Sequence, residues 1–459
     1  MHVGRLGATM RDIAMFFAML ALVPLAFKNS YNAYLLWGWT ALLSPVYYLF
    51  GFMQGLRYNL IFAAIAIGLW LLGKVDLKGK ISANSSTLLL IAFTFHVSLS
   101  ALFGYDNNPW NVQVYEGFVK AMFFVLMMPI FVSTRLRIHA LVVVICLALG
   151  FHGVVEGLKL ISSGGAHKVR GIETSMLSDN NHFAVGMGMV LPLLIFLMIH
   201  LKAQIAKYAA AAGLILTVLA IVATHSRGGF LCISVVGLWY AFTARRKVFS
   251  FFLLAVISFL AFQMAPEEWF SRIETIKTAD ADESFMGRVI AWKVSTAVAL
   301  VNPIFGGGLH AIQAAPVWQE FIYKLDFLSF ISTPLPDAQH PRAAHSIYFE
   351  ILGDLGLVGL LLFISIIINA FLTAGRIRKL TTGKENLIWA RDLADALRLA
   401  LVAYCIGGAG VSLGYLELFY VIVMLLAVLH NHIRAVSDVV NKKSAQSSLS
   451  LNRKMNLDG

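Results

Sequence analysis

The chain has 459 residues, of which 59% are hydrophobic and only 13% are charged, and its formal net charge is +12. A soluble domain carries about 25% charged residues, so this composition excludes an ordinary soluble protein and indicates one that lies in a membrane. The basic residues collect in short loops between apolar runs, as the positive-inside rule describes for cytoplasmic loops. The positive charge therefore reflects topology and does not indicate nucleic-acid binding.

Thirteen apolar runs follow one another along the chain, and each is continuous, which favours membrane-spanning helices. The first two are short and lie close together, and Pro45 falls in the second. We therefore expect a broken or re-entrant element there, about 12 transmembrane helices in an all-α polytopic protein, and both ends of the chain on the cytoplasmic face. The runs cover residues 12–27, 31–50, 58–73, 86–103, 117–134, 138–160, 182–200, 206–224, 229–243, 248–264, 345–374, 395–412 and 414–434.

The longest polar interruption divides the chain into four parts. Residues 1–264 form an N-terminal transmembrane bundle, 265–344 a large loop, 345–434 the C-terminal transmembrane helices, and 435–459 a tail rich in Ser, Asn and Lys that we expect to be disordered and cytoplasmic. The loop holds nine acidic and six basic residues, the opposite balance to the cytoplasmic loops, so we place it on the periplasmic side. Its segment from Val317 to Ile331 predicts an amphipathic helix at the membrane surface or over a cavity.

Metal and cofactor sites are not indicated. The three cysteines lie in different apolar runs and are interpreted as small core residues. Asp280 and Asp282 resemble the D-x-D pair of metal-dependent glycosyltransferases, but no third ligand follows at a fixed spacing. We expect no metal and no cofactor.

Polar residues collect in four clusters that the predicted topology places on the outer face. Each also has a structural interpretation: Asp179 and Asn180 can cap the helix that follows, the Ser226-Arg-Gly sequence can form a tight turn, and Gly306 to Gly308 suit a flexible turn. His345 can be an interfacial histidine that is hydrogen-bonded to a neighbour. The clusters are Arg170 with Asp179, Asn180, Asn181 and His182; His225, Ser226 and Arg227; Arg288 with the glycine turn that ends at His310; and Arg342 with His345.

Arginines and histidines on one face suggest phosphate chemistry. A guanidinium group binds phosphate oxygens, and a neutral imidazole takes a proton from a hydroxyl near neutral pH. The combination fits an alcohol that attacks a carbon bearing a phosphate or pyrophosphate leaving group. Glu350 and Asp354 are four residues apart on one helix face, whereas His345 and Glu350 point about 140° apart and make poor partners. We expect both carboxylates to bind neighbouring helices or a cavity.

The order of four motifs resembles the O-antigen ligase and polymerase superfamily of bacterial membrane proteins. Ser346 stands where that pattern usually has Asn, and the N-terminal part, with Asp179 to Asn181, is similar to a branch that includes predicted O-glycosylation ligases. The motifs are S-R-G from Ser226 to Gly228, G-R-x-x-x-W from Gly287 to Trp292, P-x-x-G-x-G from Pro303 to Gly308, and H-S-x-Y-x-E-x-L-x-x-x-G-x-x-G from His345 to Gly359.

The resemblance implies a GT-C-type glycosyltransferase of the bacterial inner membrane that is metal-independent, inverting and active on the periplasmic side. Its donor is a glycan on undecaprenyl pyrophosphate, and its acceptor is a sugar hydroxyl of the lipid A-core. His345 would be the base, and Arg227 and Arg288, with Arg170 as a weaker third ligand, would bind the pyrophosphate. Supporting residues would be Asn180, Asn181, Ser226, Arg342 and Glu350.

Three alternatives stay open. A protein O-oligosaccharyltransferase or an O-antigen polymerase would use the same donor with a different acceptor. A polytopic lipid or solute transporter belongs to another class, but it would place charges in the middle of its spans and often shows inverted repeats. The arginines and histidines of this chain lie mainly at one interface, which favours the transferase.

Overall fold

The computed structural model describes residues 2–49, 51–73, 84–105, 109–173, 175–243, 283–324, 330–334 and 337–455. These described residues form helices and no strand, and nine of their helices are long and apolar enough to cross a membrane. The protein is therefore an all-α polytopic membrane protein, as the sequence predicts. Twelve of the thirteen apolar runs coincide with helices, and the run at 248–264 lies outside the described residues.

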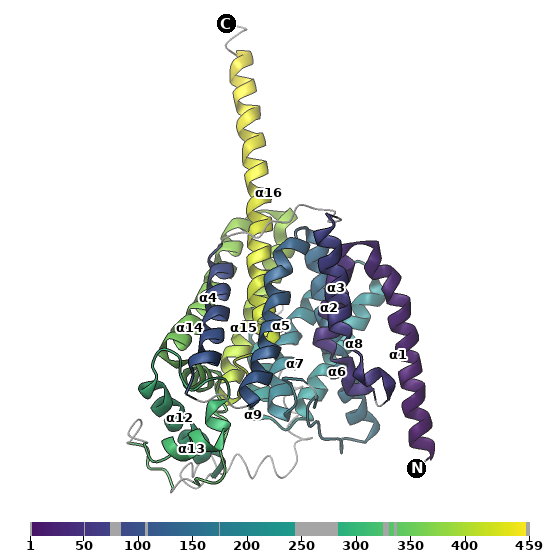
Figure 1. Ribbon diagram of the computed structural model, residues 1–459. Coiled ribbons are helices and arrows are strands. Elements are labelled where there is room, and N and C mark those ends of the chain that lie inside the picture. Colours follow the sequence, from purple (N-terminus) through teal and green to yellow (C-terminus); the bar gives the residue numbers. More distant parts are fainter. Residues whose placement is uncertain are drawn as a thin grey trace.

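The helices form one upright bundle with a small cap at one end (Figure 1). The first part of the bundle comprises α1 (His2–Lys28), α2 (Ser30–Leu43), α3 (Tyr58–Leu71), α4 (Ser85–Phe103), α5 (Pro109–Phe131), α6 (Arg135–Ser162), α7 (Asn180–His200), α8 (Gln204–Val222) and α9 (Arg227–Thr243). The cap contains α12 (Glu283–Val301) and α13 (Ala315–Phe321), and the bundle is completed by α14 (Ile347–Thr381), α15 (Ile388–Gly407) and α16 (Glu417–Met455).

The first three helices run in alternating directions, so the two ends of the chain lie on opposite faces of the bundle (Figure 1). The Tyr31 hydroxyl donates to the carbonyl of Arg137 near the start of α6, and the Tyr48 hydroxyl lies 2.6 Å from Nδ1 of His152. α2 and the 3-10 turn after it therefore run beside about half of α6, from Arg137 to His152. The predicted break is present, because α2 ends at Leu43 and a 3-10 turn begins at Pro45, but the expectation that both ends of the chain lie on one face is wrong (Figure 1).

The C-terminal tail corrects a second expectation. The composition predicts disorder from residue 435 on, but α16 continues to Met455. Neither Gly nor Pro occurs between residue 435 and residue 455, so nothing in this sequence interrupts a helix that begins inside the bundle.

The cap has a hydrophobic core of its own, separate from that of the bundle. Side chains of α12, including Ile290 and Val294, pack there against Trp318 and Phe321 of α13. The predicted amphipathic helix at residues 317–331 is shorter than expected, since α13 ends at Phe321 and residues 325–329 lie outside the described part. Ala344 belongs to the same core, so the cap anchors the chain one residue before His345.

A kink in α14 joins the cap to the bundle. Gly356 has a φ of +71°, which interrupts the helical conformation inside α14. The kink frees backbone groups, and the turn between Pro303 and Gly308 pairs with them: Gly307 and Gly308 donate to the carbonyls of Gly353 and Asp354, while Leu357 donates to the carbonyl of Pro303. The glycine turn is buried and bonded to α14, so its interpretation as a flexible turn is wrong.

Candidate active site

His345 is held in an unusual backbone conformation just before α14. Its φ of +45° lies in the left-handed region, which costs a non-glycine residue about 1–2 kcal/mol. Two side chains offset this cost. The His345 N–H donates to the Ser412 hydroxyl at 2.9 Å, and the indole N–H of Trp292 donates to the carbonyl of Ala344 at 2.8 Å. Trp292 also stacks on Phe349 with ring centroids 5.0 Å apart, so α12 contacts the chain both before and after His345.

Arg288 lies on α12, four residues before Trp292, and is half-buried. The residue before it is Gly287, and the Arg342 guanidinium occupies the space that a side chain there would need. The G-R motif thus brings a second arginine against the helix that carries the first. Arg342 itself is exposed.

The link at residues 407–412, between α15 and α16, connects both phosphate-binding candidates with the histidine. A Cβ atom built on Gly410 would lie 3.7 Å from Nη1 of Arg288. Arg227 begins α9, and a Cβ on the next residue, Gly228, would lie 3.8 Å from the first carbonyl oxygen of the link. The same link supplies the hydroxyl that binds the backbone of the histidine, so elements far apart in the sequence meet at one end of the bundle.

The other predicted residues support the loops around this link. Asn180 donates through Nδ2 to the carbonyl of Thr224, and Ser226 accepts the Gly229 N–H, so both residues hold the segment that precedes Arg227. Asn181 donates through Nδ2 to Oδ1 of Asn180. The Asp179 side chain caps α7 by accepting the backbone N–H groups of Asn181 and His182. Its structural interpretation as a helix cap is therefore confirmed.

Arg170 comes from the loop before α7 and is exposed. Its neighbour Val169 donates to the carbonyl of Ala223, so this loop is bonded to the segment that leads to Arg227. The structure therefore places Arg170 on a loop adjoining the other candidates.

Burial, together with nearby positive charge, lowers the pKa of the His345 imidazole. Burial lowers its pKa, and so do the neighbouring Arg288 and His182, whereas the carboxylates of Asp179 and Glu350 act in the opposite direction. The net effect is a pKa below the ordinary value of about 6.5. A neutral imidazole is the form that accepts a proton, so His345 is ready to act as a general base.

A second histidine, which sequence reasoning did not assign to the site, forms a buried cluster with two carboxylates. Nε2 of His310 lies 3.3 Å from Oε1 of Glu350, and its backbone N–H donates to Oδ2 of Asp354 at 2.9 Å. Tyr415 also donates to Asp354, and the Gly414 N–H donates to Oε2 of Glu350 at 2.7 Å. Both carboxylates therefore bind other segments of the protein, as the sequence predicts. We call His310, Glu350 and Asp354 the His310 cluster.

Burial makes the protonation of this cluster important. Glu350 is 3% exposed and Asp354 is 1% exposed. Burial lowers the pKa of His310, but the two adjacent carboxylates outweigh this effect and raise it above the ordinary value. Neither ring nitrogen of His310 makes a hydrogen bond of good geometry within the described residues. The signal in the sequence was the glycine turn that ends at His310, because its tight backbone brings the histidine onto α14.

The His310 cluster is also the one group of described residues with the composition of a metal site, since one ligand atom from each residue lies within 4.8 Å of the others. The protein already uses much of this capacity, because Oδ2 of Asp354 and Oε2 of Glu350 accept hydrogen bonds from the chain itself. Asp280 and Asp282 lie outside the described residues.

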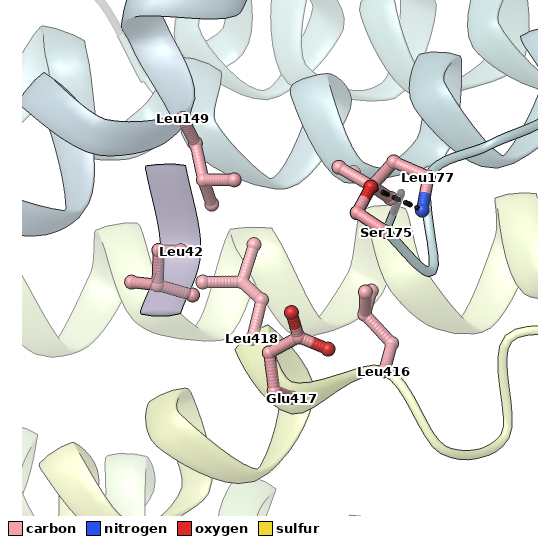
Figure 2. A pocket seen from close by; sticks show the side chains of 8 residues that line it. Leu42, Leu149, Ser175, Leu177, Leu416, Glu417 and Leu418 are labelled. Atoms are coloured by element: carbon pink, nitrogen blue, oxygen red, sulfur yellow. Dashed lines mark hydrogen bonds between the residues drawn. The ribbon is translucent and has the colours of Figure 1, made fainter. Parts of the chain in front are cut away.

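A small cavity lined by Glu417 and leucine side chains, shown in Figure 2, has a volume of only about 10 Å³, which suits one water molecule and excludes a sugar.

Two family comparisons match successive parts of the chain. A sequence model described as O-antigen ligase matches residues 212–364, which include Arg227, Arg288, His310, His345 and the His310 cluster carboxylates. A family of unknown function matches residues 10–203. No curated protein matches the chain. The first match indicates a glycosyltransferase-type enzyme with ligase- or polymerase-type activity.

Proposed function

We propose that this chain, whose residues 212–364 match the O-antigen ligase family, is an O-antigen ligase that transfers a glycan from undecaprenyl pyrophosphate to a sugar hydroxyl of the lipid A-core. The observation that carries the proposal is the pairing of a neutral histidine with arginines at one end of a membrane bundle. His345 is held by Ser412 and Trp292, and Arg288 lies close enough to lower its pKa.

In the proposed reaction His345 accepts the proton of the acceptor hydroxyl. The hydroxyl oxygen attacks the anomeric carbon of the donor glycan from the face opposite the pyrophosphate, so a glycosidic bond forms as the bond to the pyrophosphate breaks and the configuration inverts. Arg227 and Arg288 stabilise the negative charge that develops on the leaving pyrophosphate, as a divalent metal does elsewhere. Arg170 and Arg342 are further cations at the same end of the bundle.

The cap lies at the same end of the bundle as the proposed site. α12 and α13 lie over the end of the bundle where α14 begins (Figure 1). The proposed orientation puts this end at the periplasmic face of the bacterial inner membrane, where both lipid-linked substrates present their head groups. A protein O-oligosaccharyltransferase or a polymerase would take the same donor, so the acceptor is the variable that an experiment must compare.

The test is transfer by the purified protein, in detergent and without added metal, from a defined undecaprenyl-pyrophosphate glycan. Lipid A-core and a Ser/Thr-rich protein are offered together as acceptors. We expect glycan on the lipid A-core, a loss of about 10²–10⁴-fold in His345→Ala, and full activity in the control His340→Ala, whose side chain is exposed in the same loop. Glycan on the protein alone would change the acceptor and keep the mechanism. Equal activity of the two histidine variants would refute the base assignment.

A further inference from the structure

A large cavity opens at the opposite end of the bundle from His345. It has a volume of about 690 Å³ and lies between the ends of α4, α14 and α16, whereas the cap covers the other end of α14 (Figure 1). A cavity of this size suits a small ligand or a lipid head group. It is lined by Asn84, Ser85, Ser86, Thr373, Arg376, Lys379, Leu380, Ala427, His430, Asn431, Arg434, Ser437 and Asp438.

The lining is strongly basic. Arg376, Lys379 and Arg434 line the cavity with His430, and Asp438 is the only acidic residue of the lining. Within the described residues, no carboxylate lies within 4.0 Å of Arg376, Lys379 or Arg434, whereas the nearby Arg378 pairs with Asp395 at 3.6 Å. These three cations therefore face the cavity without the ion pair that a neighbouring arginine makes.

The start of α4 adds hydrogen-bond donors to the same cavity. Asn84 caps the helix by accepting the Thr87 N–H through Oδ1, and its Nδ2 is buried without a partner among the described residues. A helix N-terminus attracts anions, and a buried donor without an acceptor costs free energy until a ligand supplies one. Both features point to an anion.

A buried polar network fixes this wall in place. Asn369 of α14 accepts the Ser85 hydroxyl through Oδ1 and donates to the Ser86 hydroxyl through Nδ2, at 2.8 and 2.7 Å. Because Asn369 is buried, α4 and α14 are joined at the base of the cavity before any ligand binds. The positive-inside rule accounts for basic residues at this face, but it does not account for a cavity, a fixed wall and an unpartnered donor in one place.

We propose that this cavity binds the phosphate head group of an anionic membrane lipid. The lining combines cations and amide donors for phosphate oxygens with Leu380 and Ala427, apolar residues that suit the start of an acyl chain. Basic pockets between transmembrane helices on the cytoplasmic side bind the head groups of anionic phospholipids, and this cavity has the same basic lining and the same setting between helices. The site is independent of the proposed transferase reaction, and its test does not use transfer as a readout.

The experiment follows thermal unfolding of the full-length protein in detergent. The protein is titrated separately with short-chain phosphatidylglycerol, short-chain phosphatidylcholine and inorganic phosphate. We expect a saturable rise in the unfolding temperature with phosphatidylglycerol and little change with phosphatidylcholine, because the second head group carries a compensating positive charge. A response to inorganic phosphate equal to that of phosphatidylglycerol would overturn the lipid assignment and identify a soluble phosphate as the ligand.

Two variants test the lining itself. Arg376→Gln combined with Arg434→Gln should weaken the apparent affinity for phosphatidylglycerol by at least about tenfold. Asn84→Asp keeps the cap oxygen for the Thr87 N–H and places a negative charge in the cavity, so it should fold and lose the response. The control Arg378→Gln removes a cation of the same helix that does not line the cavity. Equal affinities in the control and in both test variants would overturn the proposal.

Discussion

Replacing Trp292 by Phe would separate the positioning of His345 from its chemistry. The ring that stacks on Phe349 remains, but the indole N–H that binds the Ala344 carbonyl is lost. Ala344 is only 3% exposed, so its carbonyl loses a partner that water does not readily replace, at a cost of about 1–3 kcal/mol. This cost is as large as the roughly 1–2 kcal/mol of strain in the left-handed backbone of His345.

The comparison of these two energies predicts the size of the effect. With one of its two supports removed, His345 should leave its productive position for a large part of the time. We expect kcat to fall by about 5- to 150-fold, which corresponds to 1–3 kcal/mol, with an unchanged KM for the acceptor. Ser412→Ala removes the other support and should act in the same way. Both changes together should fall short of the product of the two losses, because the loss cannot exceed that of His345→Ala.

The assay is the initial rate of glycan transfer at several acceptor concentrations, with thermal unfolding measured on each variant. Trp318→Phe is the matched control, because Trp318 also donates its indole N–H to a carbonyl at 2.8 Å, that of Asp337, and lies in the same cap. The control should lose stability and retain kcat. A wild-type kcat in Trp292→Phe, or an equal fall of kcat in Trp318→Phe, would refute the view that Trp292 positions the base.

Three further predictions concern pH, metal and the kink. Because the pKa of His345 is lowered, kcat/KM should rise with pH only below about 6.5 and be level above it. Glu350→Gln removes a charge that raises this pKa, so it should move the acidic limb of the pH profile to lower pH. An acidic limb that stays in place would contradict the coupling between Glu350 and His345. Transfer should survive EDTA, and a loss that magnesium or manganese restores would instead assign a metal to the His310 cluster. Gly356→Ala should lower the free energy of unfolding by about 2 kcal/mol or more, because a Cβ there would lie 2.6 Å from the Pro303 carbonyl oxygen. The control Gly375→Ala has open space in the same helix and should be neutral or stabilising by up to about 1 kcal/mol. Equal unfolding temperatures of the two variants would contradict the role of the kink.

The sequence predicts the helices well because each membrane helix is determined by the composition of its own segment. A continuous apolar run of sufficient length has few other stable conformations in lipid, so nearly every predicted run is a helix. The face on which each end of the chain lies could not be predicted in this way. Pro45 indicates where a helix ends, but it does not indicate which face of the bundle the helix has reached at that point. The tail shows the converse error: its polar composition suggests disorder, but a helix that is already formed continues until a residue breaks it.

The site could be predicted only as a set of residue types. Arginines and histidines near predicted span ends indicate which face carries the chemistry, and the structure brings Arg227, Arg288 and His345 to one end of the bundle through the 407–412 link. That link holds glycines and a serine and has no charged residue, so no pattern in the sequence identifies it. The link contributes its backbone geometry and one hydroxyl group. Neither contribution can be predicted until the positions of the surrounding helices are known.

The two glycine motifs are halves of one structural unit. Gly356 breaks α14, and the broken helix exposes carbonyl and N–H groups that only a tight turn with little side-chain bulk can approach. The turn from Pro303 to Gly308 meets this need, since a Cβ on Gly306 would lie 2.5 Å from the backbone N of Gly356. The pairing delivers His310 to Asp354 two residues after the turn ends. The kink is therefore what assembles the His310 cluster beside His345, and the order of the motifs along the chain reflects the contact between them.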